Sequence, residues 1–398
     1  MSRGGESPER PLRVLIVSHY FPPHVGGIEN VAHQQARQLA RCGVDVTVLT
    51  SGSMRGPDPV SDADGFRVVR VPAWNGFERR LGVPFPVFSP SLLRQAGRWA
   101  GWADIVHVHD SFYLSSWAAG LAAAIRRTPL VMTQHVAMVD HPATLVRWVQ
   151  SAVYATAGRA LLRRSRHTAV LNSSVASFVR DLGAPEDAVV HLPNGVDRER
   201  FRPAATPAEK VRLRERWGLP ADAVLVLFVG RPVSKKGYDI LLDAASTEYE
   251  LVFVGDKPTR AVPRDGVHHL GPMDPTELAE VYRACDIFAL PSTAEGFPLT
   301  VQEAMASGLP VVTTDDAGYA PYALDRSLLA LVERNADAVR AVLRQLASDT
   351  GRCAAMSAYS VAYAARHFSW SAHVEHLLRL YGETRGATPG AVAWEVCR

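Results

Sequence analysis

The chain has 398 residues, more than one hydrophobic core usually serves, so two or three domains are expected. Hydrophobic residues make up 47% and charged residues 21% of the sequence, as in ordinary globular proteins, and the formal net charge of +3 is too small to indicate a nucleic-acid partner. The four cysteines are scattered, which argues against a disulfide framework or a zinc site and fits a reducing cytoplasm. The start is polar, and every apolar run is far shorter than the ~20 residues of a membrane helix, which favours a soluble cytoplasmic protein.

The first half of the sequence alternates apolar strands with amphipathic helices. Residues 12–17 (LRVLIV) form a continuous β-branched run, typical of a buried parallel strand. After a loop that contains Gly26 and Gly27, residues 28–39 show helical spacing, and residues 44–49 predict the next strand. Further strands are predicted at 66–71, 104–108, 130–133, 168–171 and 188–192, and further helices at 114–125, 145–162 and 175–182. This order predicts a doubly wound α/β domain.

The second half repeats this architecture without repeating the sequence. The polar stretch 198–220 reads as a connection, and residues 223–229 (AVLVLFV) begin a second α/β series. Strands at 251–254 and 286–290 follow, with helices at 277–285, 297–306, 336–347, 353–368 and 374–381. The predicted fold class is therefore α/β with two Rossmann-like domains. Their bounds are 1–203 and 204–369, with a C-terminal helix (370–385) that packs back on the first domain and a tail (386–398).

The loop and the helix start that follow the predicted strand 286–290, within residues 291–312, suit an anion. The free N–H groups and the positive dipole end at the helix start, around Gly296 and Leu299, can hold a phosphate. Glu295 and Glu303 bracket this start, and carboxylates there suit hydroxyl groups beside the anion. A carboxylate pair also suggests glycoside hydrolysis, but both lie on one loop-helix unit, which favours binding of a single ligand.

A basic loop follows the first strand of the second domain. Arg231 and Lys236 lie where ligands bind in such folds, and the two cations could neutralise a diphosphate. Lys235 and Lys236 cannot be distinguished, and an exposed basic loop without a ligand is the alternative. Gly26 and Gly27 could let a phosphate approach the backbone, or they could simply form a tight turn.

Histidines follow three predicted strands of the first domain. His135 and His109 end strands, and His19 lies in the first loop, so all three are expected at one sheet edge. A lone histidine is more often structural than catalytic, but this group favours a polar site. No metal cluster or Ser-His-Asp triad is predicted.

Together these segments resemble the retaining glycosyltransferases of family 4, which have the GT-B architecture. The resemblance extends over nearly the whole chain. The matching motifs are GGIE (26–29), ADIVHVHD (103–110), PNGVD (193–197), GRPVSKKG (230–237), RACDIFALPS (283–292) and E-x7-E (295–303).

The resemblance implies roles for the matching positions. Arg231 and Lys236 would hold the donor diphosphate, Glu303 the ribose and Glu295 the donor sugar, while His135 would contact the transferred sugar. The implied catalytic residues are His135, Arg231, Lys236 and Glu295. The implied donor-binding residues are Gly26, Gly27, Arg231, Lys236, Gly255, Leu270, Glu295, Gly296, Phe297, Pro298, Leu299 and Glu303. The first domain would carry the acceptor, near His19, His109 and His135.

The implied reaction moves a sugar from a nucleotide-diphosphate sugar, with UDP as first choice, to an unknown hydroxyl acceptor with retained configuration. No metal or cofactor is expected. A GDP-mannose-type donor with a lipid-linked acceptor at the inner membrane surface is an alternative, because helix 145–162 ends in arginines. An epimerase, a phosphorylase or a non-catalytic scaffold are further alternatives. Residues 255–258 and 313–322 depart from the family pattern, so the resemblance leaves the donor open.

Overall fold

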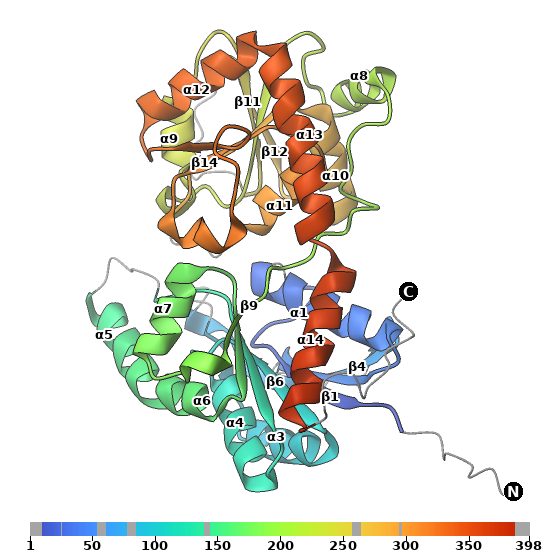
Figure 1. Cartoon of the computed structure of the whole chain (residues 1–398), viewed down its shortest axis with the longest axis vertical. Coiled ribbons are helices and arrows are strands. Elements are labelled where there is room, and N and C mark those ends of the chain that lie inside the picture. Colours follow the sequence, from blue (N-terminus) through green and yellow to red (C-terminus); the bar gives the residue numbers. More distant parts are fainter. Residues whose placement is uncertain are drawn as a thin grey trace, which may run out of the picture. The chain divides into compact units, whose positions relative to one another are not determined.

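The computed structural model describes residues 10–24, 26–53, 61–77, 85–138, 144–256, 264–293 and 297–386. The chain forms two units, each built on its own mainly parallel sheet (Figure 1). Unit 1 comprises Met1–Leu192 and Trp370–Arg398, and unit 2 comprises Pro193–Ser369. The predicted α/β class with two parallel-sheet domains is confirmed.

The sheet of unit 1 is parallel through its centre. Its strands lie in the order β3-β4-β2-β1-β6-β7-β8-β9, and β5 pairs with β4. The antiparallel pairings join β3 and β5 to β4 at one edge. The strands are β1 (Arg13–Val17), β2 (Asp45–Gly52), β3 (Ser61–Ala63), β4 (Phe66–Trp74), β5 (Val87–Phe88), β6 (Ile105–His109), β7 (Leu130–Gln134), β8 (His167–Val170) and β9 (Val189–His191).

Both faces of this sheet are buried, which explains its continuous apolar strands. In β1, Leu15 and Val17 belong to one core cluster and Val14 and Ile16 to another. The first cluster receives α3 (Ser91–Trp102), α4 (Leu114–Arg126), α6 (Arg159–Arg164) and α7 (Ser173–Asp181); the second receives α1 (Gly27–Arg41) and α14 (Trp370–Thr384). Figure 1 shows α14 running along α1 within this unit. The chain therefore returns to unit 1 at its C-terminal helix.

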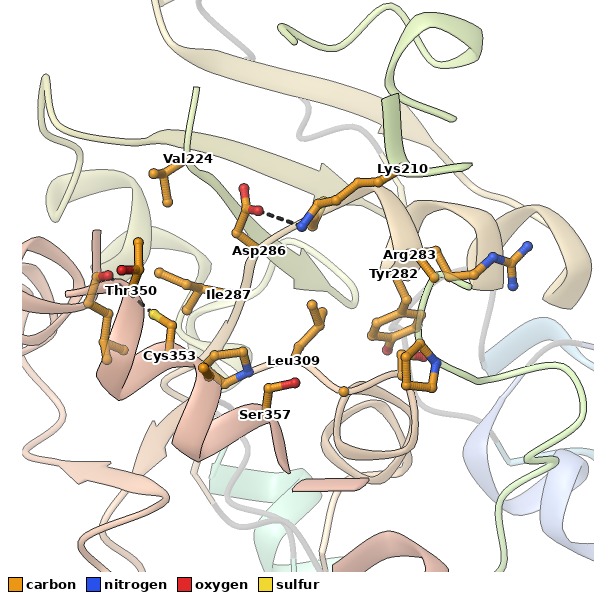
Figure 2. A pocket seen from close by; sticks show the side chains of 18 of the residues that line it. Lys210, Val224, Tyr282, Arg283, Asp286, Ile287, Leu309, Thr350, Cys353 and Ser357 are labelled. Atoms are coloured by element: carbon orange, nitrogen blue, oxygen red, sulfur yellow. Dashed lines mark hydrogen bonds and ion pairs between the residues drawn. The ribbon is translucent and has the colours of Figure 1, made fainter. Parts of the chain in front are cut away.

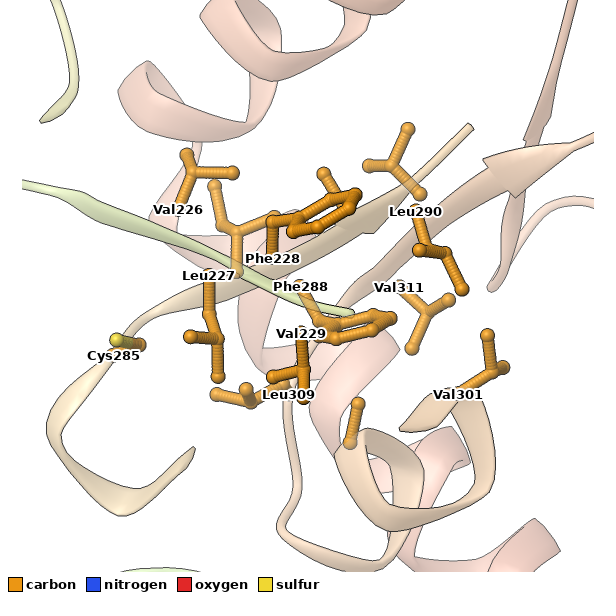
Figure 3. Close-up of a cluster of buried hydrophobic side chains, with 14 of the residues drawn as sticks. Val226, Leu227, Phe228, Val229, Cys285, Phe288, Leu290, Val301, Leu309 and Val311 are labelled. Atoms are coloured by element: carbon orange, nitrogen blue, oxygen red, sulfur yellow. The ribbon is translucent and has the colours of Figure 1, made fainter. Parts of the chain in front are cut away.

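The sheet of unit 2 is entirely parallel within the described residues, in the order β12-β11-β10-β13-β14-β15. The strands are β10 (Leu225–Val229), β11 (Glu250–Val254), β12 (Val267–Gly271), β13 (Ile287–Leu290), β14 (Val311–Thr314) and β15 (Ala330–Val332). Figure 3 shows how side chains of the central strands, such as Val226, Phe228 and Phe288, fill the core. The carboxyl ends of all six strands thus lie along one edge.

Polar caps set the helix starts of unit 2. Thr206 caps α8 (Pro207–Arg216), and Asp274 forms a capping box with Glu277 at α10 (Pro275–Ala284). Asn335 caps α12 (Ala336–Ser348), and Asp349 caps α13 (Thr350–His367). The other helices are α9 (Tyr238–Asp243) and α11 (Leu299–Ala306), and short 3₁₀ turns span Ser234–Lys236 and Ala317–Tyr322.

The structure contains elements that the sequence analysis does not predict. Helix α3, strands β12 and β15, and helix α8 inside the predicted connection are all absent from that prediction. The compact units divide after Leu192, earlier than the predicted boundary at Pro203. The reason is that Val196 pairs with Ser369 and Phe201 packs on Tyr282, both within unit 2. Cys42 is disulfide-bonded, which the scattered cysteine spacing does not predict.

Candidate functional site

Glycine backbones pack against one another at the carboxyl edge of the unit 2 sheet. The Gly230 N–H donates to Val254 O and the Gly255 N–H to Gly271 O, both at 3.0 Å. A Cβ atom on Gly255 would lie 2.3 Å from Gly230 O, so no larger residue fits there. Three successive strand ends, those of β10, β11 and β12, are thereby held close together. Of the two predicted donor residues of this region, Gly255 directly follows β11, and Leu270 lies in the adjacent strand β12.

The basic loop after β10 is fixed against the loop after β13. Gly237 has a φ of 74°, and a Cβ atom there would lie 2.2 Å from Pro291 O. The Thr293 N–H donates to Lys235 O at 3.0 Å. Arg334 bridges the two loops, since its Nε donates to Pro291 O at 3.1 Å and its guanidinium also donates to Ser234 O. The two loops therefore behave as one rigid edge.

The cations of this edge differ in environment. Arg231 is exposed and forms no ion pair with any described residue. Lys235 and Lys236 are both half-buried, and the Lys236 side chain lies beside Gly230. The structure brings Arg231 and Lys236 onto one short loop, as a diphosphate site requires, and leaves the choice between the two lysines open.

Buried aromatic rings position the start of α11. Phe297 is 2% exposed and stacks on Tyr322 with ring centroids 4.2 Å apart. The rings of Tyr319 and Phe368 also pack on Phe297, with centroids 5.0 and 5.5 Å from its own. Pro298 is the N-cap, so the first N–H groups of α11, at Leu299 and Thr300, have no acceptor within the helix. Glu295 and Gly296, which the sequence analysis places in this site, lie outside the described residues.

Glu303 faces a buried hydroxyl group rather than solvent. Its Oε2 lies 3.1 Å from the Tyr282 hydroxyl, which is also 3.1 Å from Thr300 O. Burial raises the pKa of Glu303 to about 8, while the Tyr282 hydrogen bond and the charge of Arg200 oppose this shift. The neighbours Val301, Ala304 and Met305 are buried. Glu303 is therefore a largely neutral acid in a fixed position.

In unit 1, a carboxylate folds back onto the first helix start. A Cβ atom on Gly26 would lie 2.2 Å from Glu29 Oε2, whereas one on Gly27 would meet nothing within 4 Å. Glu29 is buried, and its Oε1 lies 3.3 Å from His24 Nδ1 and 3.8 Å from His19 Nε2. The carboxylate thus covers Gly26 and leaves Gly27 as the open part of the predicted phosphate turn.

The predicted histidines meet at the carboxyl edge of the unit 1 sheet. His109 Nδ1 and His135 Nε2 are 2.9 Å apart, so these two residues share a hydrogen bond. Burial lowers the pKa of His135 to about 3 and that of His19 to about 4, and it lowers the pKa of His109 well below its usual value. His19 stacks on Tyr113 with centroids 3.5 Å apart. All three histidines are therefore neutral near pH 7.

Asp110 supports His135 from the neighbouring strand end. Its Oδ1 accepts a hydrogen bond from the His135 N–H at 3.0 Å, and its φ of 61° is left-handed, a conformation that Asp tolerates better than most residues. Burial raises the pKa of Asp110 to about 7, although backbone N–H groups of His135 and Val136 oppose this. Asp110 is not among the predicted site residues, and its signals in the sequence are its place after a predicted strand and at the end of the motif ADIVHVHD.

A cavity of about 330 Å³ lies at the opposite edge of the unit 2 sheet. Its lining includes Val224, Asp286 and Pro310, the residues that directly precede β10, β13 and β14. Figure 2 shows Lys210 paired with Asp286 on its wall, at 2.5 Å. This cavity is at the amino ends of the strands and is separate from the predicted donor site.

Several residues of the candidate site carry no sequence signal. Tyr282 reads as an ordinary helix residue and Arg334 as a surface charge, because their partners are distant in sequence. Tyr319 and Tyr322 belong to the segment that departs from the family pattern, and both are buried. Among the described residues, no group of three or more His, Cys, Asp or Glu side chains could hold a metal ion. None of the helices described is both long and apolar enough to cross a membrane.

Comparisons with known proteins follow the same division of the chain. Residues 25–200 match the family model described as Glycosyltransferase Family 4, and residues 209–362 match that of glycosyl transferases group 1. A protein of Xylanimonas cellulosilytica named D-inositol 3-phosphate glycosyltransferase is 33% identical, over 96% of this chain and 99% of its own. A protein of the same name from Stackebrandtia nassauensis is 32% identical, over 94% and 92%.

Solved structures share the fold at lower identity. Sucrose-phosphate synthase from Thermosynechococcus elongatus has a TM-score of 0.73 at 20% identity and covers 95% of this chain and 100% of its own. Anabaena Alr3699/HepE, in complex with UDP and glucose, has a TM-score of 0.72 at 18% identity, with 94% and 100% covered. Such similarity concerns the fold, and it confirms the predicted GT-B architecture.

The contact between Gly237 and Pro291 predicts a stability effect. Gly237→Ala would place a Cβ atom on a backbone with positive φ and against Pro291 O. We therefore expect the free energy of unfolding to fall by on the order of 1–3 kcal/mol. Differential scanning fluorimetry would show this as a lower melting temperature. Gly351→Ala is the matched control, because a Cβ there meets only Asp349 Oδ1 at 3.5 Å. Equal melting temperatures for the two variants would contradict the proposed packing.

The buried position of Glu303 predicts a pH effect. Its pKa is about 8 in the folded protein against an ordinary value of 4.5, so the folded state binds the proton more tightly than the unfolded state. The free energy of unfolding should therefore fall as pH rises between these values. Urea unfolding at pH 5.5 and at pH 9 measures this effect. Between these pH values the free energy of unfolding of the wild type should fall by on the order of 2–4 kcal/mol more than that of Glu303→Gln.

The exposed Glu215→Gln on α8 is the control for this measurement. It should follow the wild type at both pH values. A Glu303→Gln variant that also follows the wild type would show that Glu303 titrates normally.

Proposed function

The chain belongs to glycosyltransferase family 4 and is a glycosyltransferase, and from this premise we propose its reaction in more detail. It moves a sugar from a UDP-sugar to a hydroxyl group of an acceptor, with retained configuration and without a metal ion. The donor binds at the carboxyl edge of unit 2. The acceptor binds at the carboxyl edge of unit 1.

The observation that carries this proposal is the rigid basic loop of unit 2. Arg231 is exposed and forms no ion pair with a residue of the described ranges, and Lys236 lies on the same loop. The loop is held against the segment that leads into α11, through Gly237, Pro291 and the Thr293 N–H. Two cations and the helix dipole at Leu299 therefore lie on one fixed edge. An anionic diphosphate is the ligand that such an arrangement favours.

These groups would act on the leaving group. As the bond from the sugar C1 to the phosphate oxygen breaks, negative charge grows on the diphosphate, and Arg231 and Lys236 stabilise it. The acceptor oxygen forms the new bond to C1 on the same face, and its proton passes to a phosphate oxygen. Cations in fixed positions need no reorganisation at this moment, which is why we propose that no metal or other cofactor takes part.

Glu303 and His135 would position the substrate. A neutral carboxylic acid can both donate and accept hydrogen bonds, which suits the two adjacent hydroxyl groups of a ribose. The Tyr282 hydroxyl fixes the orientation of Glu303. In unit 1, the hydrogen bond between His135 and His109 fixes the His135 ring, which would contact the transferred sugar.

Substitution of the basic loop tests the proposal. Arg231→Ala should lower kcat/KM for sugar transfer ~10²–10³-fold, because one charge-stabilising donor is lost. Lys236→Ala should have a similar effect. Lys235→Ala, assayed beside it, shows which of the two lysines contributes to catalysis. Arg212→Ala, at an exposed position on α8, is the control. Full activity in Arg231→Ala and Lys236→Ala would refute the assigned donor site.

A donor screen addresses the nucleotide. UDP-, GDP-, ADP- and dTDP-glucose, and GDP-mannose for the alternative donor, should be compared by thermal shift with and without EDTA. The HepE structure that shares this fold contains UDP and glucose, so UDP-glucose is the first probe. Consumption of inorganic phosphate, or epimerisation without an acceptor, would instead indicate the phosphorylase or epimerase alternative.

A second proposal concerns the membrane surface. Helix α5 (Thr144–Val153) has no buried residue, and Leu145, Trp148 and Val149 are 74%, 73% and 48% exposed. These positions recur at i, i+3 and i+4, so they share one helix face. A π-helical turn (Tyr154–Gly158) and α6 with its arginines follow. An apolar face beside arginines is the pattern of a helix that lies on anionic lipid.

Vesicle binding would test this proposal. Leu145→Ser should weaken co-sedimentation with phosphatidylglycerol vesicles about 10-fold, because it removes an apolar anchor. Ile125→Ser on α4 is the matched control, since Ile125 is 72% exposed. If the wild type stays in the supernatant, or both variants bind equally, the membrane proposal is wrong.

A further inference from the structure

Two buried carboxyl groups lie near the carboxyl edge of the unit 1 sheet. Asp110 is 1% exposed and Glu29 is 5% exposed. Burial raises the pKa of Asp110, and the negative charge of Glu29 adds to this shift. Within the described part of the chain, neither carboxyl group forms an ion pair with a lysine or arginine, and Glu29 pairs only with His24 and His19. Burying a carboxyl group without a lysine or arginine partner costs free energy.

Other buried polar atoms at this edge also lack partners. Asp110 Oδ2, His109 Nε2, His19 Nδ1 and Ser111 Oγ have no hydrogen-bond partner among the described residues. All four side chains are at most 2% exposed. Buried polar groups are nearly always hydrogen-bonded in a protein's working state, to protein, water or ligand. Their concentration at the ends of β1 and β6 indicates a site for a polar ligand.

The charge of this site is negative. Burial keeps His19, His109 and His135 neutral, because it lowers the pKa of each. Glu29 remains charged. Burial raises its pKa, but hydrogen bonding and the nearby histidines lower it by more, so Glu29 is ionised near pH 7. The site therefore offers a carboxylate, a second carboxyl group and neutral imidazoles. A phosphate group would be repelled here, and an ammonium group would be attracted.

We propose that this edge of unit 1 is an acceptor subsite for an amine-bearing polyol, whose ammonium group pairs with Asp110 and Glu29 while its hydroxyl groups meet His109, His135 and Ser111. This inference rests on the proposed function and specifies its acceptor. It differs from the acceptor named for the relatives, D-inositol 3-phosphate, which carries a phosphate. Asp110 and Glu29 are the residues that set this preference, through charge rather than shape.

The shape of the Asp110 side chain is separable from its charge. Its Oδ1 accepts the hydrogen bond from the His135 N–H, and its Oδ2 has no hydrogen-bond partner in the described part of the chain. Asn can keep the first hydrogen bond and tolerates the φ of 61°. Asp110→Asn therefore removes the charge and leaves the support of His135 in place.

Three acceptors of similar size form the test, assayed on the full chain with the donor that the screen identifies. They are scyllo-inositol, scyllo-inosamine, in which one hydroxyl is replaced by an ammonium, and D-myo-inositol 3-phosphate. In the wild type, kcat/KM for scyllo-inosamine should exceed that for scyllo-inositol by about 10-fold or more, and the phosphate should be the poorest acceptor. Asp110→Asn should remove this preference, mainly by raising the KM for scyllo-inosamine.

Two further variants secure the interpretation. Glu29→Gln should reduce the same preference for the amine. It replaces Asp110→Asn as the test if Asp110→Asn does not fold. Asp187→Asn, at an exposed position before β9, should leave the preference unchanged. Preferred use of the phosphate, no transfer to the amine, or equal losses for all three acceptors in Asp110→Asn would overturn the inference.

The failure of the proposed function would look different. A chain that binds no nucleotide-sugar, and that neither transfers nor hydrolyses one, would refute the transferase site itself. A chain that binds and hydrolyses the donor but prefers the phosphorylated acceptor would refute only the acceptor inference.

Discussion

The candidate donor site depends on how closely backbones approach at the carboxyl ends of parallel strands. Gly255 packs on the carbonyl of Gly230, and Gly237 packs on that of Pro291, at distances that admit no side chain. Glycine at these positions lets neighbouring loops share backbone hydrogen bonds, which makes a loop edge as rigid as the sheet beneath it. Because the edge is rigid, the charges of Arg231 and Lys236 stay in place when charge develops on a ligand.

Burial then decides the protonation of the groups around each edge. Removal from water disfavours a charge, so it raises the pKa of Glu303 to about 8 and that of Asp110 to about 7, and it lowers the pKa of His135 to about 3. Glu29 is the exception, because its histidine partners keep its pKa low. The residue types alone would suggest charged carboxylates and a titrating histidine. The structure instead gives a largely neutral Glu303 and a neutral His135 that orient a substrate, beside a few charges of defined sign.

The sequence predicts the features that arise locally. The apolar strand runs, the glycine-rich turns and the order of elements identify two α/β units, and the loop after β10 is found from its place after a strand. The edge strand β12 escapes prediction because its residues are only partly apolar and mostly half-buried, and β15 escapes it because it has only three residues. Tyr282, its contact with Glu303 and the Asp110 contact with His135 join distant segments, and no local pattern encodes such pairs.

The two edges are opposite in charge, and this follows from how each unit treats its ionisable residues. Unit 2 leaves Arg231 exposed and, among the residues that the structure describes, without an ion pair, so a charged ligand can neutralise it at low desolvation cost. Unit 1 buries Asp110 and Glu29 beside neutral histidines, where only a cation or a set of hydrogen-bond donors can compensate them. An anionic donor and a donor-rich acceptor are thus selected by different units. Each substrate would be disfavoured at the other's edge by the same electrostatics, so the two sites discriminate between substrates that both carry many hydroxyl groups.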